Sequence, residues 1–169
     1  MVVLSTAAFA QVMTVSVDDD SWEVCPTDVV NVNVSRSTPS NNAVAMNGSS
    51  TYLEIPYSTY TSFGTSSFSV EFWVSLNSVS QLTYLAYNRN SSNQGWAVFV
   101  SQNGYVGFGA YDNAGQSDFV LGNISLINDA SWHHVAVTWN RGTTTATVYV
   151  DGGFETSKNF SLALMRFRF

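Results

Sequence analysis

Apolar and polar side chains alternate with a period of two along much of this chain. The clearest case is the stretch 67–76, in which every second residue is apolar. The apolar residues there are Phe68, Val70, Phe72, Val74 and Leu76. This spacing predicts a β-strand with one face in the core and the other toward water. Shorter stretches at 30–34 and 52–56 predict further strands, and Pro56 ends the second of these or restricts it to a sheet edge.

Two pairs of such stretches are joined by short turn sequences. Residues 95–100 and 105–110 flank Asn103-Gly104, a dipeptide that accepts the positive φ angles of a type I′ turn. Residues 132–139 and 145–150 form a second predicted hairpin, whose outgoing strand is expected to stop at Asp151. No stretch shows the period of an amphipathic helix. The pattern therefore predicts an all-β chain, folded as an antiparallel two-sheet sandwich or a barrel.

Composition and charge narrow the classes of partner. Aromatic residues make up 14% of the chain and charged residues only 11%, so polarity rests on Ser, Thr, Asn and Gly. The net charge is −6 and the sequence pI is about 4.5, which disfavours nucleic acid and heparin-like ligands. Beyond the first ten residues no segment approaches the roughly 18 consecutive apolar residues of a membrane span, so we expect none.

The 169 residues are enough for one domain, in which three regions can be separated. Residues 41–169 carry the regular strand pattern, and residues 11–40 form a leader region with some strand character. Residues 1–10 end in Ala8-Phe9-Ala10, which has the small-x-small form of a signal-peptidase site. This segment is either a signal-peptide remnant or a first strand, and both interpretations stay open.

Asn-x-Ser sequons suit a secreted or cell-surface glycoprotein, although some arise by chance in so polar a chain. They lie at Asn33, Asn47, Asn90, Asn123 and Asn159. The single cysteine, Cys25, excludes a disulfide within the chain and a cysteine zinc cluster. It is either a buried thiol or bonded to another chain.

Three segments, in this order and spacing, resemble the laminin-G-like domain of the concanavalin-A-like lectin/glucanase superfamily. They are Met46-Asn47-Gly48 with Tyr52-Leu53-Glu54-Ile55-Pro56, then Phe68-Ser69-Val70-Glu71-Phe72-Trp73-Val74, then Trp132-His133-His134-Val135-Ala136-Val137-Thr138-Trp139 ending in Val148-Tyr149-Val150-Asp151-Gly152. The resemblance covers residues 41–160. It implies a jelly-roll sandwich of antiparallel sheets. It also implies a role in adhesion, glycan binding or extracellular structure, often with a calcium ion at one rim.

One departure from the family pattern concerns the C-terminal part. In the family, the strand that ends in the segment matching 149–152 is followed by at least one further strand pair. Here we expect the last strands to be missing. Unless the leader 11–40 substitutes for them, this would leave a sheet edge open and expose apolar residues such as Phe160, Leu162 and Leu164. Another chain could then add a strand, giving a homo-oligomer or a filament.

Catalysis is not expected. Enzymes that cleave glycans need two carboxylates across the scissile bond, whereas Glu54 and Glu71 each stand alone in their predicted strands. No Gly-x-Ser-x-Gly nucleophile elbow is present in the sequence. His133 and His134 are neighbours on a strand and project to opposite faces, so they cannot share a metal ion. We predict that His133 is a hydrogen-bonded core residue.

Calcium and glycans are the candidate ligands. The loop 111–118 and the end of a nearby strand offer carboxylate and amide oxygens, which Ca²⁺ prefers. The candidate ligands are Asp112, Asn113, Asp118 and Asp151, and a hydrogen-bonded Asx turn is the alternative interpretation of the loop. Glycan binding needs an exposed aromatic platform, for which the candidates are Tyr87, Trp96 and Tyr111.

These observations predict a non-catalytic extracellular interaction or structural module, acting as a subunit of a cell-surface or extracellular assembly such as an adhesion structure or fibre. The alternative is a calcium-dependent, lectin-like glycan-binding domain. The expected partners are other protein chains and glycans, with neither nucleic acid nor a membrane span.

Overall fold

The described part of the chain consists of β-strands joined by turns and loops. The computed structural model describes residues 2–4, 9–10, 13–16, 44–46, 52–55, 66–89, 94–112 and 116–161. Short strands come first: β1 (Val2–Leu4), β2 (Phe9–Ala10), β3 (Met13–Ser16), β4 (Val44–Ala45) and β5 (Leu53–Ile55). Longer strands follow: β6 (Phe68–Ser75), β7 (Thr83–Arg89), β8 (Gly95–Val100), β9 (Tyr105–Tyr111), β10 (Ser117–Leu126), β11 (Trp132–Asn140), β12 (Thr145–Val150) and β13 (Gly153–Asn159). The all-β prediction is confirmed, and these ranges contain no helix that could cross a membrane.

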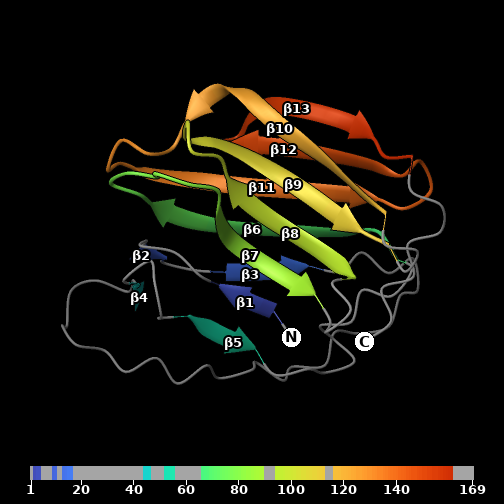
Figure 1. The fold of residues 1–169 in the computed structure, drawn as a ribbon, viewed down its shortest axis with the longest axis horizontal. Helices are drawn as coiled ribbons and strands as arrows, with labels where there is room; N and C mark the ends of the chain where they lie inside the picture. Colours follow the sequence, from blue (N-terminus) through green and yellow to red (C-terminus); the bar gives the residue numbers. More distant parts are fainter. Residues whose placement is uncertain are drawn as a thin grey trace.

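The strands form two large antiparallel sheets and one small one. The six-stranded sheet has the order β10-β9-β8-β7-β1-β5, and the five-stranded sheet has the order β13-β12-β11-β6-β3. Strands β2 and β4 pair separately. Figure 1 shows β7 to β10 running diagonally across β6 and β11 to β13, so the two sheets lie face to face. This confirms the predicted antiparallel two-sheet sandwich.

The core lies between the sheets and is built from the alternating positions. The five inward residues predicted for β6 and its end are all at most 4% exposed. Phe68 of β6 contacts the rings of Trp96 on β8 and Phe108 on β9, with centroid distances of 5.5 Å and 6.4 Å. Burying one large apolar side chain stabilises a fold by roughly 1.5–3 kcal/mol, so these aromatic contacts hold the two sheets together.

The β8–β9 hairpin forms as predicted, but through a different turn. The N–H of Gly104 donates to the carbonyl of Ser101 over 2.9 Å, which closes a turn over residues 101–104. Gly104 has a φ of +91°, whereas Asn103 is not among the residues with positive φ. A type I′ turn needs positive φ at both central residues, so the prediction of that turn type at Asn103-Gly104 is wrong.

The chain continues beyond Asp151 as another strand. Asp151 and Gly152 have φ angles of 53° and 76°, the pair of positive values that a two-residue type I′ hairpin requires. Strand β13 then pairs antiparallel with β12. The expectation that strands are missing after Asp151 is therefore wrong, because residues 153–159 form β13. Leu162 and Leu164 lie outside the described residues.

Phe160, which directly follows β13, is part of the core. It is 3% exposed, and its ring lies 5.4 Å from that of Trp139 and 6.0 Å from that of Phe108. The expectation that Phe160 would be left exposed is wrong, because β13 returns the chain to the edge of the sandwich and turns this ring inward.

The two sheets are bridged where β10 and β13 run side by side as edge strands (Figure 1). Glu155 of β13 is 4% exposed, and its Oε2 accepts hydrogen bonds from the backbone N–H groups of Ile124 and Ser125 on β10, both at 3.1 Å. Lys158 of β13 forms an ion pair with Asp118 of β10. An inward-pointing charge protects an edge from strand addition. The edge that we expected to be open is therefore occupied at these positions by the chain's own residues.

Short strands from the N-terminal region extend both sheets. Strand β1 lies between β7 and β5 of the six-stranded sheet, and β3 pairs with β6 of the five-stranded sheet. Among the sequon asparagines, Asn123 and Asn159 are exposed. The other sequon asparagines lie outside the described residues, namely Asn33, Asn47 and Asn90. The same holds for the strand predicted over 30–34 and for Cys25.

Candidate functional site

Three tyrosines and an arginine gather on the outer face of the six-stranded sheet. Arg89 of β7 lies opposite Gly95 of β8, which lies opposite Tyr111 of β9. Residues paired in this way point to the same face of an antiparallel sheet. Tyr84 and Tyr87 of β7 share that face, because a β-bulge between them adds one residue to the strand. We call Tyr84, Tyr87, Arg89 and Tyr111 the tyrosine–arginine cluster.

Ring contacts and one hydrogen bond hold this cluster together. The Cζ atom of Arg89 lies 3.7 Å from the ring centroid of Tyr111 and 5.7 Å from that of Tyr84. Nη1 of Arg89 donates to Oη of Tyr84 over 3.3 Å. The rings of Tyr84 and Tyr87 meet edge to face at 5.9 Å. All four residues are partly exposed to solvent, although Nε of Arg89 is buried.

Glycines allow two aromatic rings to lie close to the backbone of β9. Phe99 of β8 points to the same outer face as the cluster and is 6% exposed. A Cβ atom at Gly107 would lie 2.4 Å from Cζ of Phe99, and one at Gly109 would lie 3.4 Å from Oη of Tyr111. A side chain at position 107 would therefore displace Phe99 and disturb the surface beside the cluster.

Asp112 fixes the end of β9 next to Tyr111. Its N–H donates to the carbonyl of Gln116 over 2.9 Å, and its Oδ1 accepts the N–H of Gln116 over 2.8 Å. These bonds close the β9–β10 loop, but Oδ1 accepts the N–H four residues on rather than two, so they do not form the Asx turn considered for this segment. The Asp112 side chain is buried, with 2% of its surface exposed.

The structure brings together two of the three residues predicted for glycan binding. Tyr87 and Tyr111 belong to the tyrosine–arginine cluster, but Trp96 is fully buried in the core, so its assignment to an exposed platform is wrong. Sequence reasoning missed Tyr84 and Arg89 because it assigned no strand to residues 83–89. The aromatic and apolar content of that run is typical of a strand, and this signal could have found them.

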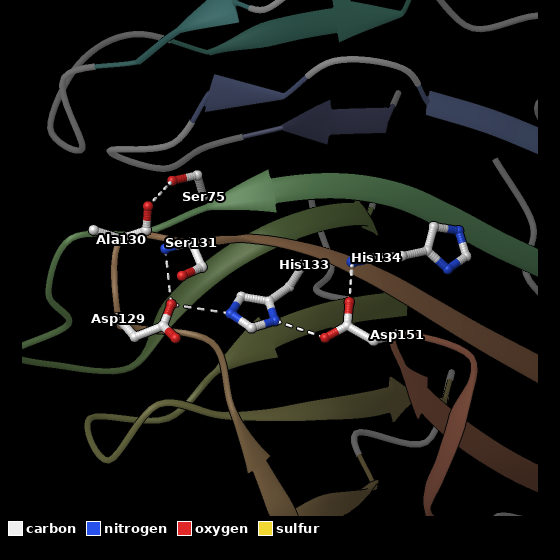
Figure 2. Close-up of polar contacts among 7 residues, drawn as sticks. All are labelled: Ser75, Asp129, Ala130, Ser131, His133, His134 and Asp151. Atoms are coloured by element: carbon white, nitrogen blue, oxygen red, sulfur yellow. Dashed lines mark hydrogen bonds and ion pairs between the residues drawn. The ribbon is translucent and has the colours of Figure 1, made fainter.

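A second polar cluster lies where β11 begins (Figure 2). The ring of His133 lies between two carboxylates, with Nδ1 2.8 Å from Oδ2 of Asp151 and Nε2 3.0 Å from Oδ1 of Asp129. Asp151 also accepts the N–H of His134, and Asp129 accepts the N–H of Ser131, both over 2.8 Å. His133 is thus hydrogen-bonded, as predicted, but it is half-buried rather than a core residue, and His134 points to the other side (Figure 2). Both ring nitrogens of His133 are occupied by carboxylate oxygens, which suits a structural role. We call His133, Asp129 and Asp151 the clamp.

The carboxylates favour the protonated form of His133. Burial alone would lower the pKa of His133, but its hydrogen bonds to Asp151 and Asp129 outweigh burial and raise this pKa. The bond from His133 is the main reason that the pKa of Asp129 is lowered. Burial acts to raise the pKa of Asp151, but the hydrogen bonds from His133 and the N–H of His134 outweigh it and lower this pKa.

Comparison with known proteins identifies the family. The family model Laminin_G_3, described as the concanavalin A-like lectin/glucanases superfamily, matches residues 47–164, which is most of the chain. The chain belongs to this laminin G-like family. The match confirms the resemblance that the three sequence segments indicated.

Relatives of this laminin G-like chain include clostridial proteins. A "Non-toxic nonhemagglutinin" of Paraclostridium bifermentans is 28% identical over 119 residues, which are 69% of this chain and 10% of that protein. The chain therefore spans about a tenth of that relative's length. The binding domain of Paraclostridial Mosquitocidal Protein 1 matches with a TM-score of 0.53 and 21% identity, over 61% of this chain and 28% of that chain. Domains LG4-5 of the mouse laminin alpha1 chain match with a TM-score of 0.49 and 19% identity, over 60% and 26% of the two chains.

The prediction that the laminin G-like chain is not an enzyme agrees with its family match. The two glutamates weighed for catalysis lie in different sheets, Glu71 on β6 and Glu54 on β5. Oε2 of Glu71 lies 3.6 Å from Nε2 of His134.

The candidate calcium ligands of the laminin G-like chain do not converge on one point. Asp118 pairs with Lys158 near the end of β13, whereas Asp151 lies in the turn before β13, about 20 Å away along this extended strand. Asn113 lies outside the described residues, among which no group of three or more His, Cys, Asp or Glu could hold a metal ion. Calcium binding by the 111–118 loop stays a prediction, without Asp151 as a shared ligand.

Proposed function

We propose that this chain is an extracellular carbohydrate-binding module and that the tyrosine–arginine cluster is its binding surface. The observation that carries the proposal is the set of half-buried phenol rings beside a guanidinium on one outer sheet face. The C–H face of a sugar stacks on such rings, while its hydroxyl groups need nearby polar atoms. Membership in a superfamily named for lectins supports this ligand class. Exposed sequons at Asn123 and Asn159 support an extracellular location.

The test is calorimetric titration of the chain with a panel of oligosaccharides. We expect Tyr87→Ala and Tyr111→Ala each to weaken binding at least tenfold, which corresponds to about 1.4 kcal/mol. Tyr149→Ala is the matched control, because Tyr149 is also a half-buried tyrosine but points to the outer face of the other sheet, where its ring contacts Phe154. The proposal fails if the unaltered chain binds no member of the panel, or if the Tyr149 variant loses as much affinity as the cluster variants.

A second candidate function is association with another copy of the chain, as the sequence predicted. The observation that favours it is the outer face of the five-stranded sheet, where Trp73, Trp132 and Phe154 are 43%, 41% and 57% exposed. Exposed aromatic patches of this kind mark protein interaction surfaces. A two-fold contact would place these rings against their equivalents. Light scattering of the isolated chain distinguishes a monomer from such a dimer.

A further inference from the structure

Arg89 is a cation without an acidic partner in the described part of the chain. The ion pairs there involve His133, His134 and Lys158, and none involves Arg89. Arg89 instead stacks over the ring of Tyr111 and donates to the hydroxyl of Tyr84. Stacking on an aromatic ring holds a guanidinium in place and leaves its charge uncompensated.

The phenol of Tyr111 does not compensate the charge of Arg89. Burial raises the pKa of Tyr111, and the neighbouring Tyr84 adds to this effect, which together outweigh the lowering by Arg89. The Tyr111 phenol is therefore uncharged at neutral pH. Asp112 follows Tyr111 directly, but its side chain is buried and accepts the N–H of Gln116. Asp118 is engaged by Lys158.

We propose that Arg89 binds the carboxylate of an acidic sugar whose ring stacks on Tyr87. The inference rests on the proposed carbohydrate-binding function and narrows its ligand class. A planar guanidinium matches a carboxylate with two parallel hydrogen bonds. Arg89 and Tyr87 are two residues apart on one strand and face, about 7 Å along the chain, a distance that one sugar residue with its carboxylate spans.

The charge of the whole chain restricts the ligand further. The chain has a net charge of −6, so a polysaccharide with many negative groups is repelled over most of the surface. A glycan that places a single carboxylate beside Arg89 is attracted by this cation and is repelled only weakly by the net negative charge of the chain. Arg89 therefore selects a singly charged glycan over both neutral and polyanionic ones.

The experiment compares matched oligosaccharide pairs that differ by one acidic group, using calorimetric titration of the full chain. The pairs are cellobiose with its glucuronic-acid-terminated counterpart, and lactose with its sialic-acid-terminated counterpart, with heparin as the polyanionic probe. We expect the unaltered chain to bind the acidic member of one pair at least tenfold more tightly than the neutral member. Arg89→Gln should remove this preference, so that the acidic and the neutral member of the pair bind with equal affinity. Arg89→Lys should keep only part of the preference for the acidic sugar, because lysine keeps the charge but lacks the planar guanidinium group.

Arg141→Gln is the matched control. Arg141 is also half-buried and takes part in none of the ion pairs of the described residues, but it lies in the β11–β12 turn of the other sheet. Its variant should keep the full preference. Thermal unfolding of each variant verifies that it is folded.

The outcomes separate the two proposals. Equal binding of acidic and neutral sugars, weakened by Tyr87→Ala, overturns the role of Arg89 and keeps carbohydrate binding. No binding of any sugar overturns both. Tighter binding of heparin, or an equal loss of preference in the Arg141 variant, shows general charge attraction and overturns the carboxylate site. If Arg89→Gln lowers stability and leaves the preference intact, Arg89 has only a structural role.

Discussion

Adjacent residues on one strand have different roles because their side chains face opposite sides of the sheet. His133 points toward the sandwich interior and is held between Asp129 and Asp151. His134 points outward, where its ring lies 5.3 Å from that of Trp73. The clamp joins the start of β11 to the β12–β13 turn, so one ring holds together segments that are distant in sequence.

The clamp should make stability depend on pH. The pKa of His133 is raised in the folded chain, so its contribution is complete below about pH 6.5 and is lost as the pH rises through the folded-state pKa. The lowered pKa values of Asp129 and Asp151 matter at acidic pH. The contribution of these two carboxylates to stability is complete above about pH 3.9 and is lost as the pH falls through their folded-state pKa values. The clamp therefore stabilises most between about pH 4 and pH 6.5.

Thermal unfolding of the unaltered chain and of His133→Gln at pH 5.5 and pH 9 tests this dependence. The unaltered chain should have the higher Tm at pH 5.5, by a few degrees because the carboxylates are solvent-screened, and this advantage should shrink at pH 9. His134→Gln controls for the loss of a histidine outside the clamp. An advantage of equal size at both pH values would contradict the assigned role of His133.

At the scale of elements, one buried carboxylate closes the boundary between two edge strands. Strands β10 and β13 end their respective sheets, and Glu155 accepts two backbone N–H groups across the gap between them. Glu155 occupies the position where a register shift interrupts the β12–β13 pairing. The bulge turns its side chain toward β10, whereas regular alternation continues on either side.

Glu155→Ala should destabilise the chain by about 2–4 kcal/mol, because it leaves the N–H groups of Ile124 and Ser125 without their charged acceptor. Urea unfolding measures this change. Glu71→Ala is the matched control, since Glu71 is exposed on the outer face of β6 and should change stability by less than about 0.5 kcal/mol. Light scattering should also show more self-association of the Glu155 variant, because its edge is no longer protected. Equal unfolding midpoints for both variants would contradict the bridging role.

At the scale of the whole molecule, aromatic rings between the sheets create the interior. Trp139 and Phe160 from one sheet meet Phe108 from the other at 6.1 Å and 6.0 Å. The outer faces then carry the groups available to ligands, with the tyrosine–arginine cluster on one sheet and exposed tryptophans on the other. Phe160 completes the interior from a position after the last described strand.

Phe160→Ala should cost about 3–5 kcal/mol of stability, because it removes a buried ring and leaves a cavity beside Trp139 and Phe108. Phe154→Ala is the matched control: the same substitution on the outer face, at a residue that is 57% exposed, should cost less than about 1 kcal/mol. Urea unfolding of both variants checks the difference. Similar costs would show that Phe160 is not part of the core.

The sequence alone predicted the elements whose pattern is local. The alternation of β6 and the two hairpins were recognised because the two-residue period and the turn residues lie within a few positions of each other. The Asp151-Gly152 turn carried the same kind of signal, and it was interpreted as the end of a strand although it joins β12 to β13. Strand β10 lacked such a signal, since its exposed face carries Phe119 and Leu121 instead of polar residues.

Only the tertiary structure decided which face each residue of β8 occupies and which residues form the candidate site. All six residues of β8 are buried, because one of its faces packs in the core and the other lies beneath aromatic side chains. No alternation in the sequence distinguishes these faces, so Trp96 could not be placed. Arg89 and Tyr111 likewise become neighbours only through their pairing with Gly95. Such pairing depends on register and packing between distant segments, whereas the sequence by itself determined the strands with clear alternation, the acidic charge and the family.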